Sequence, residues 1–222
     1  MQELTLLQTI SVWALPVLLA ITLHEAAHGW VADRLGDPTA TQLGRVTANP
    51  LKHIDLIGTI AMPMLMLVFT PVLLGTLFVL GWAKPVPVVW KNLRSPKRDM
   101  AIVAAAGPLA NLIMLVAWAL VLQGAVHYHA LVPWVAEPLG YMSWAGVVIN
   151  AILMVINLVP VPPLDGGRVL VGLLPGRAAY YVARIEPFGM LIVIALLVSG
   201  ALGWVVGPAI NWLIDLPSRM LG

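Results

Sequence analysis

The chain has 222 residues, of which 60% are hydrophobic and 10% are charged, whereas an ordinary globular domain has about 45–50% apolar and about 25% charged residues. This composition excludes a conventional water-soluble fold and indicates that lipid surrounds most of the chain. The net charge of +2 offers no basic surface for nucleic acid, and the absence of cysteine excludes disulfides, thiolate zinc sites and cysteine nucleophiles.

Five apolar stretches are candidates for insertion into a membrane, since about 20 apolar residues span a bilayer as a helix. In chain order they are residues 4–35, Ile54–Leu80, and residues 101–126, 143–159 and 186–206. The first is too long for a signal peptide, and it carries His24, Glu25 and His28. Residues 208–222 are expected to form a helix at the membrane surface.

The positive charges bear on the topology. Loops after the first, second and fourth stretches hold eleven of the twelve Lys and Arg residues, and Arg219 is the twelfth. Five crossings would divide these charges eight to four, whereas a second stretch that returns to its own side divides them eleven to one. The positive-inside rule favours the return, and Pro63 and Pro71 can break the stretch into a re-entrant hairpin. A kinked span across Ile54–Leu80 is the alternative.

The strongest motif is His24-Glu25-Ala26-Ala27-His28 in the first stretch. The i, i+4 spacing places both imidazoles on one helical face, where they can bind one zinc ion. Glu25 can then serve as the general base for a water at the metal. Ionisable residues inside a membrane span are rare and generally functional. A metal site is therefore favoured over a structural cluster of hydrogen-bonded side chains.

A catalytic zinc ion needs three protein ligands and one open position, and Asp165 is the candidate for the third ligand. It lies in the sequence NLVPVPPLDGGR, directly after the fourth stretch. The prolines favour an extended break in the helix, and Gly166 and Gly167 allow a tight turn around the carboxylate. The alternative role for Asp165 is the N-cap of the next helix.

A shared metal site also constrains the topology. The two histidines lie near the end of the first stretch, and Asp165 lies just past the end of the fourth. Both ends must therefore face the same side of the membrane. Five simple crossings would place them on opposite sides, whereas a returning second stretch places them together.

These motifs resemble the site-2 protease family of intramembrane zinc metalloproteases, and the resemblance covers about residues 24–187. Further similar segments are LGDP at 35–38, NPLKH at 49–53, GWAKPVPV at 81–88, GPLAN at 107–111 and Glu186-Pro187. The chain is most similar to the compact subgroup of that family that has neither PDZ nor CBS domains.

The resemblance implies roles for individual residues. His24, His28 and Asp165 would bind one Zn²⁺ per chain, and Glu25 would be the catalytic base. Asn157 would assist at the active site, and the alternative role for this residue is a hydrogen bond between helices.

The resemblance also implies that the segment Gly81–Val88 lines the substrate path, since an edge strand can pair with an extended peptide. A plain loop is the alternative. The substrate-path candidates are Lys84, Pro85, Val86 and Pro87. Structural residues near the site are expected to be Gly107, Pro108, Asn111, Gly166 and Gly167.

We therefore expect an all-α polytopic membrane protein with about four transmembrane helices. A re-entrant or hairpin segment, Ile54–Leu80, and a short extended membrane-associated loop near Gly81–Val88 complete the fold. Residues 1–222 are expected to form a single integral-membrane metalloprotease domain without a soluble regulatory domain, so that any regulator would be a separate protein.

By resemblance, the function is that of an intramembrane zinc endopeptidase whose substrates are transmembrane segments of membrane proteins. The expected location is the plasma membrane of a prokaryote, with the active site toward the cytoplasmic side. The alternative is a transmembrane metal-ion transporter that uses His24, His28 and Asp165. Transport needs several weak sites along a path, whereas the polar residues here converge on one cluster.

Overall fold

The computed structural model describes residues 4–62, 64–66, 68, 69, 81 and 83–220, and all regular structure in these residues is helical. Three helices are long and apolar enough to cross a membrane: α1 (Leu6–Arg34), α4 (Pro96–Tyr128) and α5 (Pro133–Asn157). A fourth span is formed if α7 (Gly176–Ala183) and α8 (Glu186–Val198), which are bent by 65°, count as one. The predicted all-α polytopic membrane protein is confirmed.

Shorter elements connect these helices. They are α2 (Thr39–Gln42), the 3₁₀ turn η1 (Pro50–Lys52), the π-helical turn η2 (Leu56–Ala61), the 3₁₀ turn η3 (Trp90–Asn92), α6 (Asp165–Leu173), α9 (Ala201–Ile214) and α10 (Leu216–Met220).

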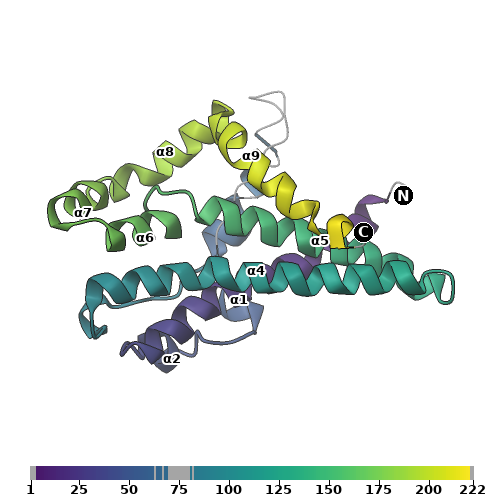
Figure 1. Ribbon diagram of the computed structural model, residues 1–222, viewed down its shortest axis with the longest axis horizontal. Helices are drawn as coiled ribbons and strands as arrows, with labels where there is room; N and C mark the ends of the chain where they lie inside the picture. Colours follow the sequence, from purple (N-terminus) through teal and green to yellow (C-terminus); the bar gives the residue numbers. More distant parts are fainter. Residues whose placement is uncertain (1–3, 63, 67, 70–80, 82, 221–222) are drawn as a thin grey trace.

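Helix α4 lies at the centre of the fold and packs against α1, α5 and α6 (Figure 1). Small residues line these contacts: Ala20, Ala104, Ala119 and Ala151 are all at most 2% exposed. Small side chains let membrane helices approach closely, which strengthens van der Waals packing where no hydrophobic effect acts between helices. Large side chains face outward instead, and Ile113 of α4 is 63% exposed. This distribution is appropriate to a protein whose solvent is lipid.

Two residues that flank the stretch Ile54–Leu80, His53 and Lys84, lie side by side. The backbone N–H of Lys84 donates to the carbonyl of His53 over 2.8 Å, so the chain leaves and re-enters the fold at one place. This contact supports the predicted return, and the hairpin itself stays a prediction. Near its start, the Asp55 carboxylate accepts hydrogen bonds from the first N–H groups of η2. Residues 63, 67 and 70–80 of this stretch lie outside the described residues.

The end of the chain differs from the prediction. Residues 186–206 do not form one helix, because Ser199 and Gly200 separate α8 from α9 and Gly200 has a left-handed φ of 75°. Glycine adopts this conformation without steric penalty. Helix α9 then packs against α5 and continues through Pro208 to Ile214. The predicted surface helix at residues 208–222 is therefore wrong at its start, and only α10 follows α9 in the described part.

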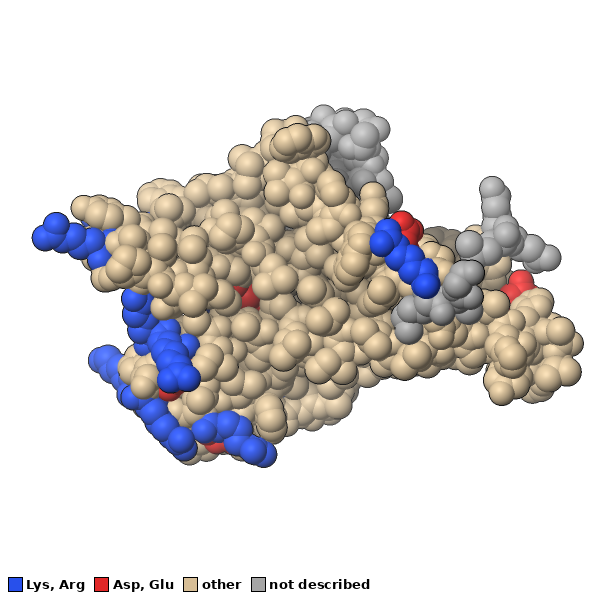
Figure 2. Space-filling view, viewed as in Figure 1, with Lys and Arg blue, Asp and Glu red and all other residues tan. Residues whose placement is uncertain are grey.

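Positive charge is gathered at one end of the molecule. The start of α1 and the turn between α4 and α5 lie at one end, and α2, α7 and the start of α4 lie at the other (Figure 1). Most Lys and Arg side chains visible in Figure 2 cluster at this second end. The fold thus brings together the loops that the sequence predicts to share one side of the membrane.

Candidate metal centre

Three side chains converge between α1 and α6. His24 and His28 belong to α1, and Asp165 is the first residue of α6. Nε2 of His24 lies 3.1 Å from Nε2 of His28, and the Asp165 carboxylate oxygen Oδ2 lies 3.2 Å and 3.3 Å from these two nitrogens. All three residues are buried, with 6–9% of their surface exposed. The structure therefore joins the HEAAH motif to Asp165, as the sequence predicts, and these three form the only group of this kind found in the described residues.

Hydrogen bonds on the far side of each imidazole fix which ring nitrogen carries the proton. Nδ1 of His28 lies 2.7 Å from the Val103 carbonyl, which can only accept, so Nδ1 is the donor. Nδ1 of His24 lies 2.5 Å from Oδ1 of Asn111. The Asn111 amide nitrogen donates to the Ala20 carbonyl and to Oδ1 of Asn150, which orients its oxygen toward His24. Both Nε2 atoms are therefore unprotonated in neutral imidazoles.

With both imidazoles neutral, the centre contains three electron-pair donors and no proton donor between them. Oδ2 of Asp165 is buried and has no hydrogen-bond partner in the described part of the chain. Three such atoms repel one another unless a cation lies between them. Tetrahedral zinc with bonds of about 2.0–2.1 Å separates its ligands by about 3.3 Å, close to the observed distances. Two imidazoles and one carboxylate also form a ligand set typical of catalytic zinc, so these residues fit the ion.

Gly107 lets α4 approach this centre. A Cβ atom at position 107 would lie 2.4 Å from Nε2 of His28 and 2.6 Å from Nε2 of His24. Any side chain there would displace the imidazoles. Gly107 thus packs closely against both imidazoles, and Pro108 lies buried beside it in α4. Asn111 does more than pack, because it holds the His24 ring in place.

Asp165 is the first residue of α6, and Leu164 occupies the N-cap position without a side-chain hydrogen bond. The alternative role of Asp165 as an N-cap is therefore wrong. The N–H of Gly167 donates to the Leu164 carbonyl over 3.0 Å, so the chain does turn tightly around Asp165, as the first turn of α6 and without a positive φ at either glycine. A Cβ on Gly166 would lie 2.2 Å from the Leu158 carbonyl oxygen. The glycines also let the first turn of α6 pack directly on the backbone of the proline-rich segment.

The Glu25 carboxylate is separate from the three converging atoms. Its Oε2 accepts a hydrogen bond of 2.9 Å from the backbone N–H of Val86. This contact places the segment Gly81–Val88 beside the HEAAH motif, with residue 82 outside the described chain. A carboxylate next to a metal site, held by a backbone donor, has the chemistry of a general base.

The same segment is not a complete edge strand. The N–H of Lys84 is used by His53 and that of Val86 by Glu25, and Pro85 and Pro87 have none. These four residues therefore offer an extended peptide only carbonyl oxygens, which limits the predicted strand pairing.

Asn157 lies at the C-terminal end of α5, and its amide donates to the Leu153 carbonyl of its own helix over 2.9 Å. This bond holds the side chain against α5, so an active-site role for Asn157 stays a prediction.

Sequence analysis missed two polar residues. Asn150 is fully buried and bonds Asn111 and the Gly146 carbonyl. Asp37 is fully buried where α1 meets the extended segment. An isolated amide in an apolar helix was a usable signal for Asn150, because such groups need partners in lipid.

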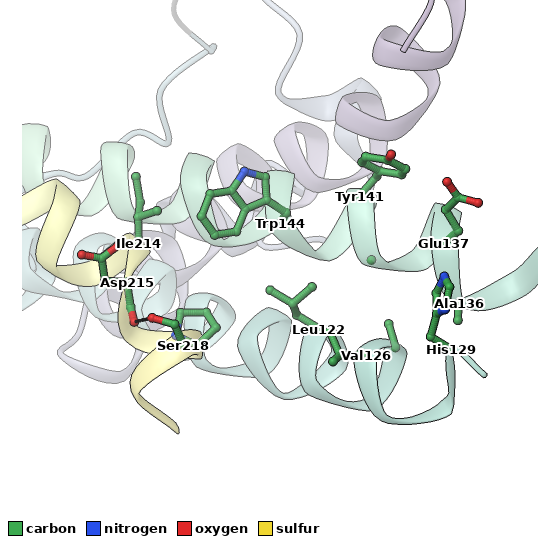
Figure 3. A pocket seen from close by; sticks show the side chains of 13 residues that line it. Leu122, Val126, His129, Ala136, Glu137, Tyr141, Trp144, Ile214, Asp215 and Ser218 are labelled. Atoms are coloured by element: carbon green, nitrogen blue, oxygen red, sulfur yellow. Dashed lines mark hydrogen bonds between the residues drawn. The ribbon is translucent and has the colours of Figure 1, made fainter. Parts of the chain in front are cut away.

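A cavity of about 700 Å³ lies far from this centre, between α4, α5 and the α9–α10 turn. Leu122, Trp144 and Ile214 supply apolar walls, and Glu137 lies near one end (Figure 3). Leu122 follows Gly107 by 15 residues, about 22 Å along α4. The cavity is therefore distinct from the metal centre.

The converging HEAAH histidines and Asp165, with a separate carboxylate beside them in a bundle of membrane-spanning helices, define a membrane-embedded metallohydrolase. A sequence model of peptidase family M50 matches residues 122–200. YwhC of Bacillus subtilis, which is named as a zinc metalloprotease, is 33% identical over 88% of this chain and 84% of its own length. The chain belongs to peptidase family M50, the site-2 protease family, and is a zinc metalloprotease.

Two further relatives carry the same activity in their names. Rip2 of Mycolicibacterium smegmatis is 30% identical over 89% of this chain and 71% of its own. Rip2 of Mycobacterium tuberculosis is 29% identical over 90% of this chain and 71% of its own. No solved structure matches the chain.

Proposed function

We propose that this chain is an intramembrane zinc endopeptidase that cuts transmembrane segments of membrane proteins. The observation that carries the proposal is the depth of the candidate centre. His28 lies six residues before the end of α1 and His24 lies ten before it, which is about 9 Å and 15 Å along a helix. The hydrocarbon core is about 30 Å thick. If α1 ends at the membrane surface, peptide bonds that reach these residues would lie within the bilayer.

His24, His28 and Asp165 would hold one zinc ion per chain. When bound, the ion supplies a Lewis acid that polarises a carbonyl and lowers the pKa of water. Glu25 takes a proton from the attacking water as the new C–O bond forms. It then delivers this proton to the amide nitrogen as the C–N bond breaks. The first products are a carboxylic acid and an amine, and Glu25 is again a carboxylate. The acid then passes its proton to the amine, which leaves a carboxylate and an ammonium group.

A transmembrane helix must unwind locally to expose a peptide bond, because its amides are hydrogen-bonded within the helix. The carbonyl oxygens of Lys84 to Pro87 would accept hydrogen bonds from N–H groups that unwinding releases. This proposal explains why the segment lies next to Glu25 while offering acceptors and no free N–H. Asn157 would assist at the same site.

Cleavage in a defined bilayer tests the proposed function. Purified protein is reconstituted in vesicles with a peptide that contains a single membrane span. We expect cleavage within the span, loss of cleavage when a chelator removes zinc, and recovery when zinc is restored. Zinc uptake is measured in the same vesicles. Zinc uptake without cleavage of any membrane-spanning peptide would contradict the protease proposal and favour the metal-ion transporter.

The proposed location is the plasma membrane of a prokaryote, with the centre toward the cytoplasm. The gathering of Lys and Arg at that end of the fold supports this orientation. The chain has no cysteine, so single cysteines can be placed at Lys52, Lys91, Arg177 and His127. We expect an impermeant thiol reagent added outside intact cells to label only position 127. Opposite labelling of positions 52 and 91 would contradict the returning segment.

A further inference from the structure

Asp37 connects three parts of the chain, one of which carries the backbone N–H that contacts Glu25. It follows α1 directly after Gly36, whose φ is 112°, and its side chain is completely buried. Oδ1 accepts hydrogen bonds from the Thr39 hydroxyl at 2.5 Å and from the Asn92 amide at 2.9 Å. Oδ2 accepts a hydrogen bond of 2.6 Å from the N–H of Val89. One carboxylate therefore connects α2, η3 and the end of the extended segment.

Hydrogen bonds stabilise the negative charge of Asp37. Burial by itself would raise the pKa of this carboxyl, but hydrogen bonds from Thr39, Asn92 and Val89 outweigh that effect, and its pKa lies below the ordinary value. Hydrogen bonds to an ionised acceptor are about twice as strong as neutral ones. The ionised Asp37 thus holds Thr39, Val89 and Asn92 together at the positively charged end of the fold.

The segment from Lys84 to Val89 is held at both ends and in the middle. Lys84 donates to the His53 carbonyl, Val89 donates to Asp37, and Val86, between them, donates to Glu25. Val86 is only three residues from the Asp37 contact. A shift of the segment at Val89 therefore moves the donor that orients Glu25.

We propose that Asp37 is a positioning residue for the catalytic base: its carboxylate fixes the extended segment whose Val86 N–H holds Glu25 in place. The inference rests on the proposed function, since it assigns Glu25 the proton transfer. Asp37 touches neither the metal-binding atoms nor Glu25, so its effect passes through the backbone of residues 86–89. A displacement of about 1 Å at a reacting group can lower a rate about 100-fold.

The first test compares Asp37→Asn with Asp33→Asn. Asp33 lies on the last turn of α1 and bonds Thr41 of α2, but it has no contact with the extended segment. We expect Asp37→Asn to lower kcat about 10–100-fold, to keep its zinc and to speed hydrogen exchange of the backbone at residues 84–89. Asp33→Asn should change none of these. Equal kcat in the two variants overturns the proposal.

A double-mutant cycle tests whether Asp37 acts on Glu25 through the Val86 N–H. Val86→Pro removes the N–H that Glu25 accepts and is compatible with extended backbone. If Asp37 acts through this donor, Asp37→Asn should add little further loss in the Val86→Pro background, whereas independent effects multiply. Multiplying losses would overturn the proposed route.

Asn92→Ala covers the case in which Asp37→Asn does not fold. Asn92 is exposed and supplies only one of the hydrogen bonds to Asp37. Its loss should leave the fold intact and lower kcat by a smaller factor, and an unchanged kcat would count against the proposal. Wild-type protein that cleaves nothing overturns the proposed function, and this inference with it. Active wild type with equally active variants overturns this inference alone.

Discussion

Glu25→Gln is expected to retain zinc and to lose cleavage by about 10²–10⁴-fold, the usual contribution of general acid–base catalysis. The substitution keeps the size of the side chain and its acceptor oxygen, so the hydrogen bond from Val86 can persist. It removes the group that takes the proton. The atoms proposed to bind the metal belong to His24, His28 and Asp165, so zinc content should stay at one per chain. The measurement is the rate of peptide cleavage beside zinc analysis of the same sample.

Glu137→Gln is the matched control, because Glu137 is an exposed carboxylate beside the distant cavity. It should leave both cleavage and zinc content unchanged. A Glu25→Gln protein that cleaves at the wild-type rate would show that another group serves as the base.

Asp165→Ala is expected to lose zinc and, with it, all cleavage. The variant keeps only two protein ligands, one fewer than a catalytic zinc site requires. Loss of a residue that merely orients a ligand lowers metal affinity about 10–100-fold, so removal of a direct ligand should exceed that range. Zinc affinity is measured by competition with a chelator of known strength.

Two further variants serve as comparisons for Asp165→Ala. Asn111→Ala removes the acceptor that orients His24. This variant should bind zinc about 10–100-fold more weakly than the wild type. Asp215→Ala changes an exposed carboxylate beside the cavity and should have no effect. Full zinc occupancy in Asp165→Ala would show that a different third ligand exists.

The metal-binding group was predictable because its signal is local. The spacing of His24 and His28 fixes their common face, and the prolines before Asp165 mark the end of a helix. The return of Ile54–Leu80 followed from the charge distribution and from the need to bring Asp165 to the histidines. None of these inferences requires knowledge of which side chains touch.

The remaining features depend on contacts between distant segments. The sequence predicts that Gly166 allows a tight turn. It does not show that a Cβ at this position would clash with the Leu158 carbonyl. Asp37 follows a helix end, where carboxylates are common, and only the fold brings Val89 to it. Helix α9 turns away at Gly200 and packs against α5, and hydropathy alone does not reveal this change of direction.

The amide that orients His24 has an electrostatic consequence. Two neutral imidazoles, the carboxylates of Asp165 and Glu25 and one divalent ion sum to zero formal charge. Asn111 and Asn150 extend the hydrogen-bonded network into the bundle without altering that sum. A carboxylate at position 111 would leave an uncompensated negative charge in a medium of low dielectric constant, where such charges are expensive. A centre loaded with the proposed zinc ion would therefore be electroneutral, and it could lie within the hydrocarbon region without a further counter-ion.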